Sequence, residues 1–412
     1  MLHRGLRKAL LHATTMLAIG GAAPAADQPS VTPGPGSYLF VWSGDSDEKD
    51  SDFLAVVDVR ASSPAYGSVV ATLPVGATAT MPHHIEYEYP SNHLLFVNGW
   101  KAGRSFIIDL RDPLRPKLAG DFTGAAGYSY PHSFARLPNG NVAAVFQSRG
   151  NVYTGPGGLL ELDNSGKAVR AASSATPDIP NKLNWPYSLA VHPSLDRIIT
   201  TSTDMGGLPV KYETGDTNHV QLWSKSGLKL LASVPLPPSP APNARHHVWP
   251  AEPRVLADGS VYVNTFNCGL YRLSDIDGAA PKASFVHAFP GGTGEHDMCA
   301  VPVVAGKYWV QTVAGLPGLI VLDISDPARP IEVSRLRLDP ERYHMPHWLS
   351  ADRASDRLVV TGSRGSWVLM VRLDPATGQL AIDERFKVNF DRTRWPHGAT
   401  GPAWVHGAVF NN

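Results

Sequence analysis

A short sequence motif that contains histidine or proline, the repeat phrase, recurs along the chain about every fifty residues. Its successive copies start at residues 83, 132, 187, 246, 296, 347 and 406, with spacings of 49, 55, 59, 50, 51 and 59 residues. Between the copies, short apolar runs alternate with turns rich in the 38 glycines and 36 prolines, and few segments have the longer period of a helix. A period of this length predicts similar supersecondary units packed side by side.

One repeat unit shows the local pattern. A first strand is expected at His132–Leu137, followed by a turn at 138–140 and a second strand at Val142–Gln147. The Asn-Gly pair in this turn is typical of a tight hairpin, because both turn positions favour positive φ. Leu159–Asp163 and Val169–Ser173 complete the unit as its third and fourth strands. Four antiparallel strands repeated at this spacing predict the blades of a β-propeller.

The two ends of the chain complement each other. The last phrase provides one strand, His406–Phe410, with no unit after it. Tyr38–Ser43, Phe53–Val59 and Ser68–Leu73 are three strands with no phrase before them. One strand and three strands make a complete blade, and their pairing covers two sheet edges that would otherwise expose backbone groups. With six complete units, this predicts an all-β fold: a seven-bladed β-propeller over residues 37–412, closed by the carboxyl-terminal strand.

Residues 1–26 are expected to be a secretion signal. Basic side chains within residues 3–8 precede a mildly apolar stretch at 9–21, and residues 23–25 (Ala-Pro-Ala) have the small-residue pattern that signal peptidase accepts. A short amphipathic helix of the folded domain is the alternative interpretation. Residues 27–36 then form a proline-rich leader. These assignments predict a periplasmic or secreted protein.

The cysteines and the charge balance limit the classes of partner that the chain can have. An oxidising compartment permits Cys268 and Cys299 to pair, although two buried thiols fit the sequence equally well. The 36 basic and 36 acidic side chains cancel, so the chain lacks the electrostatic signature of nucleic-acid binding. No segment approaches the roughly 20 apolar residues that span a bilayer. P-loop, dinucleotide-binding and Ser-His-Asp patterns are absent. The sequence therefore predicts a small-molecule partner and leaves the oligomeric state open.

Histidines concentrate at the start of the repeat phrases. In a propeller the first strand of each blade lines the central channel, so side chains at equivalent positions on these strands form a ring around the axis. Six of the seven units carry histidine at this position, and the remaining unit carries Tyr187. The candidate metal ligands are His83, His84, His132, His247 (or its neighbour His246), His296, His347 and His406.

Converging imidazoles predict a metal site. Protonated rings repel one another and neutral rings need partners in a narrow space, and a divalent metal resolves both problems by accepting nitrogen lone pairs. An all-imidazole set of four or five ligands suits copper, iron or zinc. Because alternate residues of a strand face opposite sides, only one of His83 and His84 is expected to face the axis. Glu86, Glu295 and Asp297 are expected to orient the rings. The alternative is that single histidines hydrogen-bond to neighbouring backbone.

Other aromatic residues lie near the same phrases. Tryptophans at positions 185, 249, 348, 395 and 404 either pack between blades or roof a water-poor pocket over the metal. His344 and His397 fall in predicted connections, and we interpret both as solvated or lid residues.

Several phrases along the mature chain, taken in order, resemble the selenium-binding protein family, whose bacterial members include the copper-dependent methanethiol oxidases. The matching phrases are Tyr38-Leu39, residues 52–59 (DFLAVVDV), His83-His84, His132, residues 155–158 (GPGG), residues 322–327 (LDISDP) and residues 401–406 (GPAWVH). No single phrase is diagnostic, and their order and spacing together carry the resemblance.

The resemblance implies a seven-bladed propeller with a histidine-bound copper that oxidises a small thiol with O2 to formaldehyde, hydrogen sulfide and hydrogen peroxide. This chain departs from the family in places. The family's reactive cysteine, expected just after Tyr38-Leu39, is Val41 here. The residues after His84 differ from the family's paired-histidine phrase, and His347 stands where the family typically has another residue. The family's long insertions are also missing.

The leading hypothesis is therefore a copper-dependent oxidoreductase that resembles methanethiol oxidase. A non-haem iron oxygenase of the carotenoid-cleavage type is the first alternative, because that family also places four histidines on the axis of a seven-bladed propeller. A non-catalytic propeller that binds metal or selenium is the second. A lactonase-type propeller with bound calcium is weaker, since hard cations prefer carboxylate and carbonyl oxygens to imidazole.

Overall fold

The computed structural model describes residues 34, 36–150, 152–177, 184–205, 218–239, 249–292 and 297–412. Contacts divide the chain into two compact units, Met1–Gly34 and Pro35–Asn412. Of the first unit only Gly34 is described, so the expected signal peptide and nearly all of the proline-rich leader lie outside the described residues.

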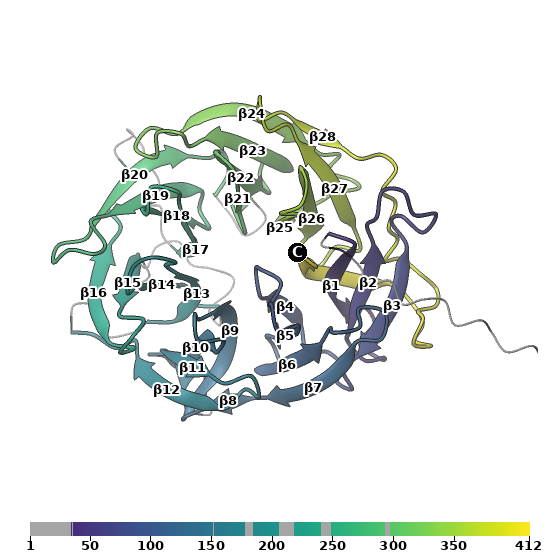
Figure 1. The fold of residues 1–412 in the computed structure, drawn as a ribbon, viewed down its shortest axis with the longest axis horizontal. Helices are drawn as coiled ribbons and strands as arrows, with labels where there is room; N and C mark the ends of the chain where they lie inside the picture. Colours follow the sequence, from purple (N-terminus) through teal and green to yellow (C-terminus); the bar gives the residue numbers. More distant parts are fainter. Residues whose placement is uncertain are drawn as a thin grey trace, which may run out of the picture. The chain divides into compact units, whose positions relative to one another are not determined.

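Residues 36–412 form seven antiparallel sheets arranged around one axis (Figure 1). The structure confirms the all-β class and the seven-bladed β-propeller. Apolar clusters fill the spaces between neighbouring sheets, as expected for blades that are buried on both faces. Among the described residues, no helix has the length and apolar character needed to cross a membrane.

Six sheets follow the chain in order. The strands of the first three, from the axis outward, are β4 (Pro82–Ile85), β5 (Leu94–Gly99), β6 (Arg104–Asp109) and β7 (Lys117–Phe122); β9 (Tyr128–Arg136), β10 (Val142–Arg149), β11 (Gly158–Leu162) and β12 (Ala168–Ser173); and β13 (Pro186–Val191), β14 (Ile198–Ser202), β15 (His219–Trp223) and β16 (Leu230–Pro235). Those of the next three are β17 (Pro250–Val255), β18 (Val261–Thr265), β19 (Gly269–Ser274) and β20 (Lys282–Ala288); β21 (Val303–Ala305), β22 (Tyr308–Val313), β23 (Gly318–Asp323) and β24 (Ile331–Arg337); and β25 (Pro346–Ala351), β26 (Arg357–Gly362), β27 (Val368–Leu373) and β28 (Leu380–Ile382).

The seventh sheet joins the two ends of the chain. Its strand order is β29 (Ala403–Phe410), β1 (Tyr38–Asp45), β2 (Phe53–Asp58) and β3 (Val69–Pro74). β29 is antiparallel to β1, with Leu39 opposite Phe410 and Asp45 opposite Ala403. The predicted closure of the ring by one carboxyl-terminal and three amino-terminal strands is confirmed.

Two details differ from the expected pattern. The blade that contains β9–β12 gains a fifth strand, β8 (Gly124–Ala125), which pairs with the start of β9. Ala126 and Gly127 between them have φ of 49° and 80°, the left-handed conformation that lets a two-residue turn fold back so tightly. The inner strands β17 and β21 begin after their histidine-bearing phrases, because residues 246–248 and 296 precede Pro250 and Val303.

Five inner strands share a bulge directly after a proline. On β4, Pro82 lies opposite Gly99 but Ile85 lies opposite Val97, so three residue steps on β4 match two on β5. A shift of this kind also follows the prolines of β9, β13, β17 and β25. Proline has no backbone N–H to donate, and it is tolerated in sheets at bulges such as these. A bulge also breaks the alternation of side-chain directions, so two consecutive residues can face the axis.

Candidate metal centre

Five of the predicted histidines meet on the propeller axis. His83 and His84 lie on β4, His132 on β9, His347 on β25 and His406 on β29, and each is at most 5% exposed. The ring centroids of His83 and His406 are 4.0 Å apart, and those of His347 and His406 are 4.5 Å apart. His132 lies 5.0 Å from His83 and 4.3 Å from His84. Residues from opposite ends of the sequence are thus brought into one cluster.

The expectation that only one of His83 and His84 faces the axis is wrong. Their rings are stacked with centroids 4.6 Å apart, and one ring nitrogen from each of His83, His84 and His132 lies within 4.8 Å of the other two. The cause is the bulge after Pro82, which removes the alternation on which the expectation depended.

Most imidazole nitrogens of this cluster are buried without a hydrogen-bond partner among the described residues. These atoms are both ring nitrogens of His83, both of His406, Nε2 of His132 and Nε2 of His347. A buried polar group without a partner is costly, and one bound ion would satisfy several of these nitrogens at once. The donor set therefore fits a metal that accepts imidazole nitrogen.

The protonation state of the rings also favours metal binding. Burial lowers the pKa of His132 to about 3 and that of His347 to about 4. Burial, reinforced by the neighbouring imidazoles, holds the pKa values of His83, His84 and His406 well below the usual range. All five rings are therefore neutral at pH 7, and a neutral imidazole has a lone pair to offer.

The hydrogen bond of His132 fixes which nitrogen carries that lone pair. Its Nδ1 lies 2.7 Å from the backbone oxygen of Tyr187, which can only accept a hydrogen bond. The proton therefore resides on Nδ1, and the unpartnered Nε2 presents its lone pair to the cluster. The phenol ring of Tyr187 packs against His132 at 4.2 Å, so the one unit without histidine supports its neighbour instead.

His84 differs from the other four rings because both of its nitrogens have partners. Nδ1 lies 2.8 Å from Ser133 Oγ and 3.1 Å from the hydroxyl of Tyr87, and Nε2 lies 3.1 Å from the hydroxyl of Tyr187. The indole of Trp348 packs edge-on against the ring at 5.3 Å. To bind a metal through Nε2, His84 would have to exchange the Tyr187 contact for the ion.

A buried carboxylate lies beyond His84, and the sequence did not predict it. Glu252 on β17 accepts hydrogen bonds from Tyr87 at 2.9 Å and Ser188 at 2.8 Å, and Arg254 donates to the same carboxylate at 3.0 Å. Burial raises the pKa of Glu252, while the Arg254 guanidinium opposes that rise. Arg254 also lies over the Tyr87 ring, 4.2 Å from its centroid. These contacts fix the Tyr87 hydroxyl beside His84.

One signal in the sequence points to these missed residues. Five residues occupy the second position after an inner-strand proline: His84, Ser133, Ser188, Glu252 and Trp348. They form a layer of side chains that contact one another along the axis. The position before it is occupied by His83, His132, Tyr187, Ala251 and His347. Consecutive residues of each inner strand thus contribute to two neighbouring layers, because each of these strands has a bulge directly after its proline.

Glu86, Glu295 and Asp297 were predicted to orient the histidine rings, and the structure describes two of these three residues. Glu86 accepts hydrogen bonds from the backbone N–H of Phe96 and from the Arg136 guanidinium, which forms an ion pair with it. It therefore holds β5 and β9 together and does not orient a histidine, because it lies past the bulge, where the regular alternation has resumed. The backbone oxygen of Asp297 accepts from the N–H of Gly292, and the role of its carboxylate remains a prediction. Glu295, His296 and His247 lie outside the described residues.

A cavity of about 490 Å³ opens onto the cluster. His83, His347 and His406 form part of its wall, and Trp249 and Trp404 are among the aromatic residues around it. His344, interpreted from the sequence as a solvated or lid residue, is exposed and also lines this cavity. Two of the five tryptophans thus roof a pocket.

Two further tryptophans and His397 have packing roles. Trp348 stacks on Tyr87, and Trp395 packs on Phe53. His397 lies against Phe53 and its Nδ1 is 2.7 Å from the hydroxyl of Thr72, so it is a partly buried contact of blade closure and not a solvated residue.

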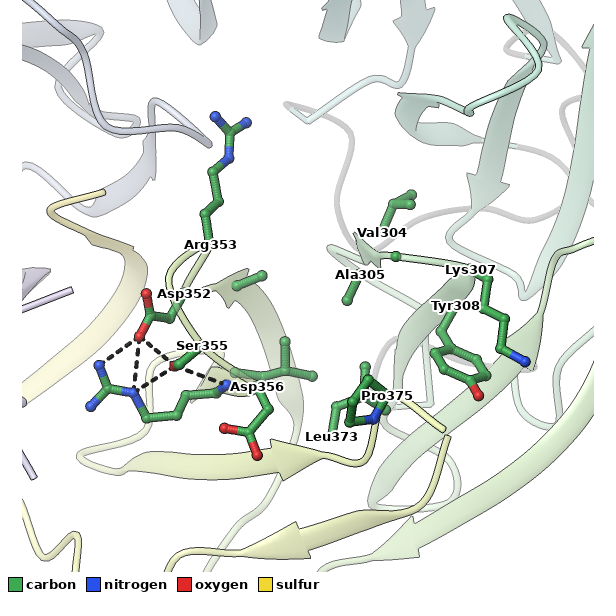
Figure 2. Close-up of a pocket in the computed structure, with 14 residues that line it drawn as sticks. Val304, Ala305, Lys307, Tyr308, Asp352, Arg353, Ser355, Asp356, Leu373 and Pro375 are labelled. Carbon is green, nitrogen blue, oxygen red and sulfur yellow. Dashed lines mark hydrogen bonds and ion pairs between the residues drawn. The ribbon is translucent and has the colours of Figure 1, made fainter. Parts of the chain in front are cut away.

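A second cavity, of about 430 Å³, lies between the β21–β22 and β25–β26 turns (Figure 2). An ion pair between Asp352 and Arg357 lies on its wall, and Arg357 also donates to the backbone oxygen of Gly36 at 2.8 Å. These contacts attach the start of the propeller to β26. The wall contains none of the predicted site residues, which fits a structural role.

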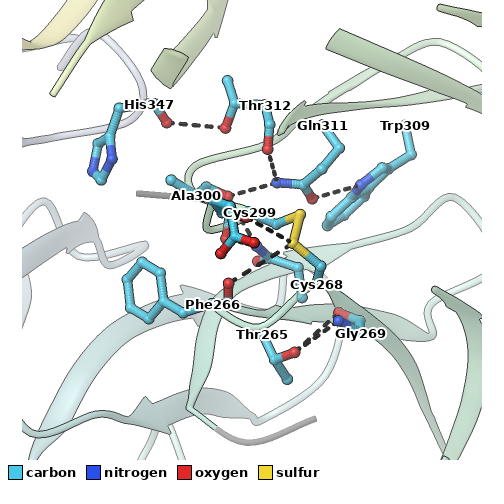
Figure 3. The surroundings of a disulfide bond; sticks show 12 residues. Thr265, Phe266, Cys268, Gly269, Cys299, Ala300, Trp309, Gln311, Thr312 and His347 are labelled. Carbon is cyan, nitrogen blue, oxygen red and sulfur yellow. Dashed lines mark hydrogen bonds between the residues drawn. A yellow bond between two sulfur atoms is a disulfide. The ribbon is translucent and has the colours of Figure 1, made fainter. Parts of the chain in front are cut away.

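Cys268 and Cys299 form a disulfide, so the first of the two open alternatives holds (Figure 3). The bond joins the β18–β19 turn to the segment before β21, within the apolar cluster between these two blades. Phe266 and Met298, each next to one of these segments, line the axial cavity. The disulfide therefore holds part of the cavity wall in place.

Known proteins with a similar sequence or fold point to the same family. No protein-family model matches the sequence. A methanethiol oxidase of a Hyphomicrobium species is 31% identical over 172 residues, which are 40% of this chain and 38% of that protein. An X-ray structure of a hypothetical selenium-binding protein from Sulfolobus tokodaii superposes with a TM-score of 0.73 and 19% identity, covering 92% of this chain and 94% of the other. Over that part of its sequence the chain is similar to a methanethiol oxidase, and its fold is similar to that of a selenium-binding protein.

The match to the methanethiol oxidase spans well under two thirds of that protein's length, so its activity is carried to this chain only as a proposal. Other propellers share the fold at lower identity. A periplasmic gluconolactonase from Pseudomonas aeruginosa superposes with a TM-score of 0.64 and 11% identity, over 91% of this chain and 99% of that chain. At such identity the likeness shows the fold alone, and the match to the methanethiol oxidase supports the resemblance found in the sequence.

Proposed function

We propose that this protein is a copper-dependent oxidoreductase that oxidises a small, sulfur-containing substrate with O2 on the propeller axis. The observation that carries the proposal is the set of buried imidazole nitrogens without partners on His83, His132, His347 and His406. These four residues would hold the metal, with His84 as the fifth ring of the cluster. Copper when bound would supply redox chemistry toward O2 and a soft centre for sulfur.

The chain's own residues prepare this site. Burial keeps the histidines neutral, and the Tyr187 carbonyl directs Nε2 of His132 toward the cluster. Trp249 and Trp404 line the cavity beside these rings. A small thiol fits a cavity of about 490 Å³ with such walls. In the proposed overall reaction, methanethiol, O2 and water yield formaldehyde, hydrogen sulfide and hydrogen peroxide, each in equimolar amount. The carbon of the thiol is oxidised and O2 is reduced to peroxide.

Elemental analysis of the purified protein tests the metal. We expect close to one copper per chain, and loss of it in the His132→Ala and His406→Ala variants. His287→Ala is the matched control, because His287 lies on the outer strand β20, away from the axis. Copper that persists in both axial variants would overturn the assignment. Iron in place of copper would favour the carotenoid-cleavage alternative.

A separate assay tests the substrate. Copper-loaded protein incubated with methanethiol and O2 should release sulfide and peroxide in equal amounts, and the His406→Ala variant should not. Stoichiometric copper with neither product would leave a metal-binding propeller without this oxidase activity, which is the non-catalytic alternative.

We also propose that the protein is exported. The disulfide between Cys268 and Cys299 supports this proposal, because such bonds persist in oxidising compartments. Expression of the full chain in a bacterium should yield a periplasmic protein whose amino terminus begins close to residue 26. An uncleaved protein in the cytoplasmic fraction would contradict it.

A further inference from the structure

Arg364 is the one permanently charged side chain among the described residues that line the axial cavity. The same part of the wall contains no aspartate or glutamate, and Arg364 forms no ion pair with any described residue. Its guanidinium donates a hydrogen bond to Sδ of Met81 at 3.3 Å, and thioether sulfur is a weak acceptor. A guanidinium has five N–H donors, so most of them remain available to a ligand in the cavity.

The backbone places Arg364 beside the histidine cluster. Gly365 forms an antiparallel bridge with Val405, and its carbonyl accepts a hydrogen bond from the N–H of Val405 at 2.9 Å. Because the pair is antiparallel, the residue before Gly365 lies next to the residue after Val405, which is His406. Burial is the main cause that lowers the pKa of His406, and the positive charge of Arg364 adds to this effect. A small molecule can therefore contact the guanidinium and the His406 ring at the same time.

The backbone of Arg364 adopts the left-handed conformation, with a φ of 59°. Met81, Trp249 and Met345, which line the same cavity, share this conformation, with φ values of 60°, 61° and 46°. Twelve non-glycine residues of the described chain have positive φ, so four of the twelve meet at a single cavity. Strained conformations of this kind concentrate at sites that hold a ligand. The wall around Arg364 is thus typical of a binding site.

The chemistry of the wall favours a small anion with an apolar body. One guanidinium balances one negative charge, and it can bind a carboxylate through two parallel hydrogen bonds. Trp249, Phe266 and Trp404 line the same cavity and provide apolar surface for a short hydrocarbon chain. A metal held by the histidines would add positive charge close to Arg364, and a negatively charged ligand offsets the repulsion between the two. These features together indicate a short carboxylic acid.

We propose that the substrate of this cavity is a short mercaptocarboxylate, whose carboxylate binds the Arg364 guanidinium while its sulfur faces the histidine cluster. The role of the sulfur rests on the proposed function, whereas the role of the carboxylate rests on Arg364. With 3-mercaptopropionate, O2 and water, the products are 3-oxopropionate, hydrogen sulfide and hydrogen peroxide in equimolar amounts. The carbon next to the sulfur loses two electrons and becomes an aldehyde, O2 accepts the two electrons, and the sulfur leaves as hydrogen sulfide.

Equilibrium binding tests the carboxylate end without turnover. Anaerobic titration calorimetry of the full purified protein compares 3-mercaptopropionate with 3-mercaptopropionamide, a neutral molecule of nearly the same shape. Both molecules carry the same thiol, so the ratio of their dissociation constants isolates the contribution of the negative charge. We expect the carboxylate to bind roughly tenfold more tightly than the amide. Equal dissociation constants for the two molecules would overturn the proposal.

Variants of Arg364 identify the group that binds the carboxylate. Arg364→Met removes the charge and keeps an unbranched side chain, so the preference for the carboxylate should fall below about twofold. Arg364→Lys keeps the charge but loses the paired hydrogen bonds, so part of the preference should remain. Arg115→Met is the matched control, because Arg115 is an exposed residue between the outer strands β6 and β7, and this variant should keep the full preference. A full preference in Arg364→Met would refute the assignment.

Sulfide release separates this proposal from the proposed function. In copper-loaded protein, kcat/KM should be roughly tenfold higher for 3-mercaptopropionate than for the amide, and Arg364→Met should remove most of this difference. Tighter binding of the carboxylate without sulfide release from either molecule would remove the oxidase function and leave the Arg364 site standing. Sulfide release with equal kcat/KM and equal dissociation constants for both molecules would remove the Arg364 site and leave the oxidase function standing.

Discussion

Acid should destabilise the metal-free protein through the buried histidines. An unfolded chain takes up a proton on histidine near pH 6.5, whereas burial lowers the folded pKa to about 3 for His132 and about 4 for His347. Between those values the unfolded chain binds protons that the folded chain excludes, so the free energy of unfolding falls as the pH falls. From pH 7 to pH 5 the loss is about 2 kcal/mol for each of the two rings, or about 4 kcal/mol together.

The other three rings also lower the free energy of unfolding as the pH falls, because burial lowers the pKa values of His83, His84 and His406. Urea unfolding of chelator-treated protein at several pH values measures the effect, and the pH slope should decrease by about one proton in the His132→Gln variant. The same substitution at the exposed His93 is the matched control. A free energy of unfolding that changes by less than about 1 kcal/mol between pH 7 and 5 would show that the folded cluster accepts protons, and would refute the reasoning.

Three further perturbations test the framework around the cluster. Replacing Cys268 and Cys299 by alanine removes a crosslink over 31 residues and should lower the free energy of unfolding in urea by about 3.7 kcal/mol, and an unchanged value would mean that the unfolded chain is not constrained by the bond. Glu252→Ala leaves the Arg254 guanidinium without its buried partner and should cost about 3 kcal/mol, measured in the same way, whereas Glu252→Gln keeps the hydrogen-bonding shape and should cost less. Deleting residues 403–412 should abolish cooperative thermal unfolding, while removal of the last residue alone should not, and a cooperative transition in the longer deletion would contradict ring closure by β29.

The architecture could be predicted from the sequence because the repeat phrases and turns are local features with a fixed spacing. The Asn-Gly turn between β9 and β10 and the unmatched strands at the two ends determine the blade count without knowledge of any contact. The fifth strand β8 was not predictable in this way. It depends on a two-residue turn in which Ala126 adopts a left-handed conformation, and alanine carries no sequence signal for that conformation.

The axial histidines could be predicted as a group, because equivalent positions on inner strands must meet at the axis. Their individual directions could not, since these depend on the bulge after each proline. A bulge changes the register by one residue and exchanges the two faces of the strand. For this reason His84 faces the axis together with His83, and Glu86 turns away to pair with Arg136.

The network behind His84 required three-dimensional information. Tyr87 lies on the connection after β4 and Glu252 on β17, 165 residues later, and neither repeats a histidine-bearing phrase. Only the shared position after an inner-strand proline relates Glu252 to His84, and it becomes informative once the bulges are known. Buried polar residues of different types can occupy equivalent positions in a repeat when each is satisfied by its neighbour.

Val41, at the position of the family's reactive cysteine, lies outside the axial histidine cluster. Val41 is fully buried on β1, between Ala55 of β2 and Ala408 of β29. In this blade β29 lines the axis, so a side chain at position 41 is one strand removed from the inner strand that carries His406. Exchanging the family's cysteine for valine therefore leaves the axial ligand set intact. The chain's two cysteines, Cys268 and Cys299, are joined in a disulfide, so the proposed function assigns the oxidation of a sulfur substrate to the histidine cluster.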